Sequence, residues 1–176
     1  MFRSKSTPAQ PQQPWAMQIL TLHYLIDGSV QPNDEIKILL GGGSNYYESR
    51  YVVTLTNAKV QPTGDLTTQP FFVPQWTVEH RGGLVALIPR DEACTQALSK
   101  IIQSKSLGYR AVIYAGPYVI RGTLESPAPT MAFETYAFMP IRDAQIDCQL
   151  PGARLAGFTA PLMVVNRELW QGYHPA

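Results

Sequence analysis

The chain has 176 residues, the length of one domain or of two small ones. With 45% hydrophobic residues it can build a core, and 14 Lys and Arg against 13 Asp and Glu leave a formal net charge of +1. A near-neutral chain argues against a dedicated nucleic-acid binder, which needs a basic face. No apolar run reaches the roughly 20 residues of a membrane-spanning helix.

The N-terminal segment, residues 1–16, is predicted to be a disordered tail. It is rich in Ser, Thr, Pro and Gln and ends near Trp15. Arg3 and Lys5 are not followed by an apolar segment, so we do not expect a secretory signal.

The segments that follow favour strands and turns. Residues 18–24 and 51–60 are rich in Leu, Val, Ile, Thr and Tyr, which favours strands. Between them, the glycine-rich segment Gly41–Ser44 predicts a hairpin tip. It lacks the Lys of a phosphate-binding loop, and Tyr46 stands where a nucleophile elbow needs glycine.

One helix is predicted over residues 91–106. Asp91 is a suitable N-cap, and Gly108 lies beyond the C-terminal end as a stop signal. The apolar stripe expected to pack on the sheet is formed by Ala93, Ala97, Leu98, Ile101 and Ile102. We expect the helix to cover a barrel mouth or the seam between the parts that it connects.

An internal repeat is the strongest pattern in the sequence. Three blocks occur twice in the same order: residues 24–30 match 118–124 at an offset of 94, 55–60 match 141–146 at 86, and 70–75 match 161–166 at 91. Gly28 and Gly122 occupy the same place in both copies and predict a bulge or bend.

The repeat leads to a prediction of fold class. We expect a mainly β protein with two pseudo-equivalent small β-barrel-like repeats, 17–90 and 107–176, joined by the helix. The repeats form either two small barrels or one shared barrel.

Catalytic chemistry has little support in the sequence. The histidines form no H-x-x-x-H pair, and the carboxylates are scattered, so we assign no catalytic, metal-ligating or cofactor-binding residue. Cys94 and Cys148 form no C-x-x-C motif and favour a reducing cytoplasm, although a disulfide between them stays open.

Aromatic residues cluster near the third block of each copy, among them Trp76, Trp170 and Tyr173. In a single-strand or sugar binder such side chains stack on the ligand beside a basic groove, but this chain lacks the charge for one. We therefore interpret them as core or interface residues.

The second copy resembles an uncharacterised bacterial family of small β domains. The matching residues are Gly122–Leu124, then Phe138-Met139-Pro140-Ile141-Arg142-Asp143-Ala144, then Val165-Asn166-Arg167-Glu168. The likeness covers Ala111–Tyr173, whereas the first copy departs from it, with Asn57 in place of the Asp and Gln75-Trp76-Thr77 in place of Asn-Arg-Glu. The resemblance implies a fold and no activity. It marks Asp143 and Arg167 as polar positions, which we expect to fix strand register through an ion pair or hydrogen bond.

Three functions remain open from the sequence. The favoured one is a non-enzymatic structural or protein-interaction module that associates with itself or with another protein. The alternative is a small-molecule-binding or enzymatic β-barrel with a pocket at the seam between the repeats. Nucleic-acid binding is the least favoured, because the net charge is so small.

Overall fold

The computed structural model describes residues 13–32, 52–64, 68–79, 81–102, 107–126, 137–150, 155 and 157–176. Within these ranges the chain forms ten strands, one α-helix and the 3-10 turn η1 (Arg167–Leu169). In chain order the strands and the helix are β1 (Trp15–Thr21), β2 (Tyr24–Val30), β3 (Val52–Pro62), β4 (Phe71–Glu79), β5 (Leu84–Pro89), α2 (Glu92–Ile102), β6 (Leu107–Ala115), β7 (Tyr118–Ser126), β8 (Phe138–Cys148), β9 (Phe158–Asn166) and β10 (Trp170–Pro175). The predicted mainly β class is confirmed. The glycine-rich segment Gly41–Ser44 lies outside the described residues.

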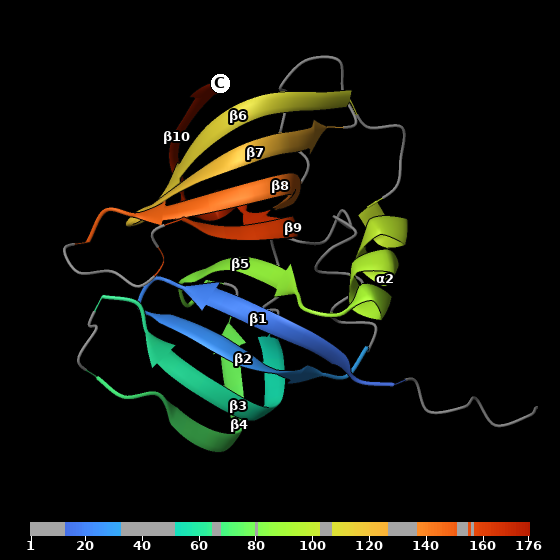
Figure 1. Cartoon of the computed structure of the whole chain (residues 1–176), viewed down its shortest axis with the longest axis vertical. Helices are drawn as coiled ribbons and strands as arrows, with labels where there is room; N and C mark the ends of the chain where they lie inside the picture. The colour runs from blue at the N-terminus through green and yellow to red at the C-terminus, as the bar shows by residue number, and fades with distance from the viewer. Residues whose placement is uncertain are drawn as a thin grey trace, which may run out of the picture.

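All ten strands belong to one antiparallel sheet, in the order β10-β6-β7-β8-β9-β5-β1-β2-β3-β4. Strands β10 and β4 are the outermost of the described strands and lie near opposite ends of the long axis of the molecule (Figure 1). Because these two strands do not pair with each other, the sheet is not closed into a barrel.

The central strands of this sheet are buried on both faces. All six residues of β5 are buried. Leu84 and Leu87 belong to a first core, with side chains of β1 to β4, whereas Val85, Ala86 and Ile88 belong to a second core, with side chains of β6 to β9. Strand β9 divides its side chains between the two cores in the same way. The sheet therefore has a core on each face of its central strands.

The two halves of the sheet have the same internal strand order. In β1 to β5 the order is β5-β1-β2-β3-β4, and in β6 to β10 it is β10-β6-β7-β8-β9, so in both halves the fifth strand lies beside the first. Paired residues correspond as well: the Ile19–Ile26 pair of the first half matches the Ile113–Ile120 pair of the second. From a residue of the first half to its counterpart in the second, the residue number rises by 94 on the first two strands and by 86 on the third and fifth.

Gly28 and Gly122 lie at matching register shifts. The pairing of β2 with β3 shifts between Asp27 and Ser29, and that of β7 with β8 shifts between Arg121 and Thr123. A Cβ on Gly28 would come within 2.9 Å of the Leu55 Cβ, and one on Gly122 within 2.7 Å of the Arg142 carbonyl oxygen. Only glycine lets the neighbouring strand approach this closely, so the predicted bulges are confirmed.

The third sequence block is shifted by four residues from the register in the sheet. Phe71 pairs with Val60 on β3, and Phe158 pairs with the corresponding Ile146 on β8, so the offset is 87 and not 91. This register also aligns Pro74 with Pro161. Short apolar segments can be aligned with one another at several offsets, whereas the cross-strand pairing in the sheet permits only one offset.

Helix α2 begins where the sequence predicts. The Asp91 carboxylate accepts a 2.6 Å hydrogen bond from the Cys94 backbone N–H as an N-cap, and another of 2.6 Å from the N–H of Ala16 on β1. Cys94 and Leu98 enter the first core, whereas Ala93 of the predicted stripe is exposed. The helix therefore covers the first core beside β1 and β5 (Figure 1).

Two of the predicted boundaries differ slightly from the elements. Strand β1 begins at Trp15, inside the predicted tail, and α2 ends at Ile102, whereas residues 1–12 and 103–106 lie outside the described ranges. Within those ranges, none of the helical structure has the length and apolar character that crossing a membrane requires.

Candidate functional site

Outer strand β4 exposes large apolar side chains along the edge of the sheet. Phe72 is 75% exposed and Phe71 is 40% exposed. Trp76, one of the predicted interaction residues, is half-buried on the same strand, and its ring lies 5.9 Å from that of Tyr24 and 6.1 Å from that of Phe71. Trp76 packs against the first core, so the phenylalanines provide most of the accessible apolar surface of this edge.

Outer strand β10 carries the other two predicted aromatic residues. Trp170 is half-buried against the second core, and Tyr173 is 44% exposed. Their ring centroids lie 5.8 Å apart in an edge-to-face arrangement. The sequence clusters of aromatic residues thus mark the two opposite edges of the sheet.

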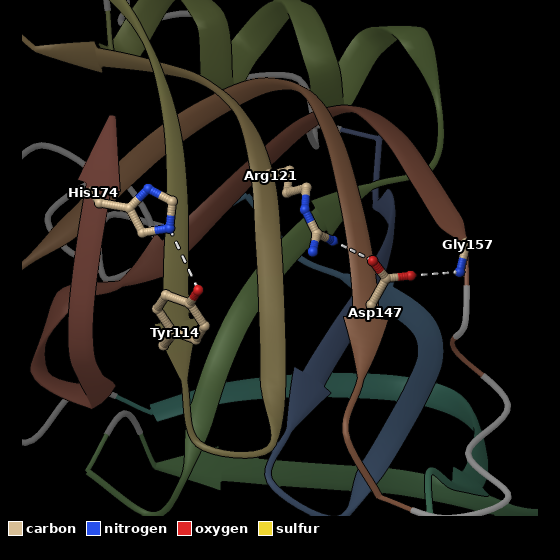
Figure 2. A network of polar contacts seen from close by, with 5 residues as sticks. All are labelled: Tyr114, Arg121, Asp147, Gly157 and His174. Atoms are coloured by element: carbon tan, nitrogen blue, oxygen red, sulfur yellow. Dashed lines mark hydrogen bonds and ion pairs between the residues drawn. The ribbon is translucent and has the colours of Figure 1, made fainter. Parts of the chain in front are cut away.

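Beside β10, polar contacts occupy the outer face of the second half. Figure 2 shows the Tyr114 hydroxyl on β6, which lies 3.4 Å from His174 Nε2 on β10. On the adjoining strands Arg121 forms an ion pair with Asp147, which also accepts a 3.1 Å hydrogen bond from the Gly157 N–H (Figure 2). The side chains of this ion pair are 47% and 37% exposed, so it contributes little to stability.

Asp143 and Arg167, the polar residues of the family-like pattern, lie at different places. Asp143 is exposed on β8 with a φ of 49°, and the corresponding Asn57 on β3 has a φ of 52°. Asn and Asp are the non-glycine residues that adopt this left-handed conformation most readily. Arg167 begins η1, and its N–H donates to the Ala137 carbonyl at 2.8 Å. No ion pair joins Asp143 to Arg167 in the described part of the chain.

Two buried polar side chains connect the halves, and the sequence did not single them out. The Tyr118 hydroxyl donates a 2.8 Å hydrogen bond to the Thr21 carbonyl and lies 3.0 Å from Thr63 Oγ1. The Asn166 side-chain amide donates to the Leu84 carbonyl at 2.9 Å. The identity of Tyr24 and Tyr118 in the repeat was the only available signal, because these partners lie 55 to 97 residues away along the chain.

In the described part of the chain, two buried ionisable groups have resolved pKa shifts, and both are held in their neutral forms. Burial, followed by the charge of Asp91, raises the pKa of the Cys94 thiol to about 12. Burial raises the pKa of Tyr118 to about 12, although its hydrogen bond with Thr63 acts in the opposite direction. These shifts are opposite to those of an activated nucleophile, which needs a lowered pKa.

The seam for which the sequence suggested a pocket is packed with apolar side chains. Leu87 of β5 and Val164 of β9 pair across it, and both are 0% exposed. Within the described ranges, no group of three or more His, Cys, Asp or Glu side chains could hold a metal ion. Cys94 and Cys148 are free thiols.

Comparisons with family models, with curated proteins and with solved structures found no match to this chain. The resemblance to the small β-domain family therefore stays a prediction.

Proposed function

We propose that the chain is a non-enzymatic protein-interaction module that binds its partners through the outer strands β4 and β10. Within the described part of the sheet each of these strands has a neighbouring strand on one side, and the proposed partner adds a strand on the other side through backbone N–H and C=O groups. Strand addition supplies affinity through these backbone groups, and side-chain contacts supply specificity.

One observation carries this proposal. Five large apolar side chains are exposed in the described ranges, and three of them lie on the outer strands: Phe71 and Phe72 on β4, and Tyr173 on β10. Long edges with exposed apolar residues are an aggregation hazard that proteins normally blunt. The presence of exposed apolar residues on both edges favours the interpretation that a protein partner covers these edges.

We also propose that the two halves are copies of one five-stranded unit, each forming a small, open, barrel-like lobe. Their common strand order and matching bulges support a duplication. Hydrogen bonds just beyond the ends of β5 and β10 support the duplication too. The Arg90 N–H donates to the Ala16 carbonyl at 2.9 Å, and the corresponding Ala176 N–H donates to the Arg110 carbonyl at 3.1 Å. Bulges and hydrogen bonds at the ends of strands are discrete features, so their recurrence at the same offsets favours a duplication.

Site-specific photo-cross-linking in the native host tests the interaction proposal. A photoreactive amino acid replaces Phe72 on one edge or Tyr173 on the other. The control replaces Gln145, which is exposed on the inner strand β8. We expect discrete cross-linked products from both edge positions and none from Gln145. A folded protein that cross-links from neither edge would overturn the proposal.

A further inference from the structure

The sheet contains one junction between its two halves. Strand β5, the fifth strand of the first half, pairs antiparallel with β9, the fourth strand of the second half. The paired residues are Ala86 with Val165 and Leu87 with Val164. The junction is thus head-to-tail, because each half contributes a different edge.

The two outer strands correspond to the two strands of this junction. Strand β10 is the fifth strand of the second half, and β4 is the fourth strand of the first half. The offset of 86 places Gly172 and Tyr173 at the positions of Ala86 and Leu87. The offset of 87 places Thr77 and Val78 at the positions of Val164 and Val165.

We propose that β10 of one molecule pairs antiparallel with β4 of a second copy of this chain, in the register Gly172 to Val78 and Tyr173 to Thr77. The contact between molecules thereby repeats the contact between halves. This inference rests on the proposed function, since it names the partner of the same two edges.

Strand direction and molecular shape are compatible with such an assembly. The sheet has ten strands, an even number, so adding a second copy at either edge continues the antiparallel alternation. The two edges lie near opposite ends of the molecule (Figure 1), so a copy bound at one edge leaves the other edge open. A head-to-tail contact of this kind produces a ring if its rotation closes and a filament if it does not.

Prolines on the outer strands do not prevent this pairing. Pro74 on β4 and Pro175 on β10 lack the N–H that a sheet requires. Their counterparts Pro161 and Pro89 lie on β9 and β5, outside the residues paired at the internal junction. The two proposed pairs, at Thr77 and Val78, likewise do not include Pro74.

The new contact should be weaker than the internal one. Ala86 and Ile88 of β5 contribute to the second core, whereas their counterparts on β10 are Gly172 and the exposed His174. The counterpart of the buried Leu20 is Tyr114, which contacts His174 (Figure 2). Pairing of β10 with β4 therefore buries less apolar area than the internal junction does. We expect a correspondingly weak association, whose extent varies with protein concentration.

Mixing of edge-blocked variants tests the head-to-tail arrangement. One variant carries Phe72→Lys and Thr77→Lys on β4, the other carries Tyr173→Lys and His174→Lys on β10, and Gln145→Lys is the control. Each sample is measured over a wide range of concentrations by analytical ultracentrifugation, after circular dichroism shows that it is folded.

We expect the native chain and the Gln145→Lys control to form species larger than a dimer, and each blocked variant to associate at least about tenfold more weakly. An equimolar mixture of the two blocked variants should form a 1:1 dimer that does not grow, because one intact edge of each kind remains. A native chain that stays monomeric, or a blocked variant that dimerises by itself, would overturn the inference. If the edges still cross-link to a different protein, the proposed function survives this failure.

Cysteine cross-linking tests the register. In a Cys148→Ser background, Thr77→Cys with Tyr173→Cys should form disulfide-linked multimers at least about fivefold faster than the displaced pair Glu79→Cys with Tyr173→Cys, since directly opposite residues meet the distance that a disulfide needs. Equal rates for both pairs, or faster linkage of the displaced pair, would overturn the register.

Discussion

The phenolic hydroxyl of Tyr118 donates a 2.8 Å hydrogen bond to the backbone carbonyl of Thr21, across the boundary between the two halves of the sheet. Tyr118 is 0% exposed, and its hydroxyl also lies 3.0 Å from Oγ1 of the buried Thr63. Nearby, Gly116 of the β6–β7 turn leaves space for Leu22, whose Cδ2 would lie only 2.5 Å from an added Cβ. The turns at this boundary are therefore fitted to each other.

Replacing Tyr118 with Phe should lower the free energy of unfolding by about 1–3 kcal/mol, because the buried Thr63 hydroxyl and the Thr21 carbonyl lose a partner. Urea denaturation at pH 7 measures the change. Tyr114→Phe is the matched control, because among the described residues its hydroxyl makes only the exposed 3.4 Å contact with His174. Equal effects of the two substitutions would contradict the role given to Tyr118.

Alkaline pH should destabilise the fold through Tyr118. Its pKa rises from 10.0 to about 12 on folding, chiefly by burial, so between these values the unfolded chain loses a proton that the folded chain keeps. The stabilisation is complete below pH 10 and is lost as the pH approaches 12, by up to about 2–3 kcal/mol. The Tyr118→Phe protein should have a shallower slope of stability against pH above pH 10. Identical slopes for the two proteins would rule out this linkage.

Gly122→Ala should cost about 1–3 kcal/mol, because the added Cβ would lie 2.5 Å from Ile141 Cγ2 and 2.7 Å from the Arg142 carbonyl oxygen. Gly172→Ala is the control, since no atom lies within 4 Å of its added Cβ. Thermal unfolding at low protein concentration compares the two. A Gly122→Ala protein as stable as the control would show that the bulge can open.

Asp143 should matter for its backbone conformation and not for its charge. Asp143→Asn and Asp143→Gly should change stability by less than about 0.5 kcal/mol, whereas Asp143→Ala should cost about 1 kcal/mol at a φ of 49°. Asn57→Ala should cost a similar amount at the corresponding position of the first half. If the Asn substitution at position 143 costs as much as the Ala substitution, the charge is important after all.

The two thiols should react at very different rates. Burial, followed by the charge of Asp91, raises the pKa of Cys94 to about 12, whereas Cys148 is only half-buried. At pH 8 a thiol reagent should modify Cys148 at least about tenfold faster than Cys94 in the folded protein, and both should react in urea. In a Cys148→Ser protein, fast modification of the remaining thiol without urea would show that α2 opens readily.

The sequence by itself determined the mainly β class and the start of the helix. Alternating β-branched and aromatic residues specify strands, and the Asp91 N-cap specifies the start of α2, because both signals act between residues that are close along the chain. The two glycines at positions 28 and 122 could be paired from sequence because a glycine within an apolar block is distinctive.

Only the tertiary structure decided the register of the fourth strands, the shared sheet and the polar links across it. The sequence matched Phe71 with Leu162, whereas cross-strand pairing matches it with Phe158. Two small barrels or one shared barrel were expected, but β5 and β9 pair with each other, which joins the halves into one open sheet. These outcomes depend on how separate strands pair and on contacts between residues far apart along the chain, such as Ala86 with Val165, for which local patterns carry no information.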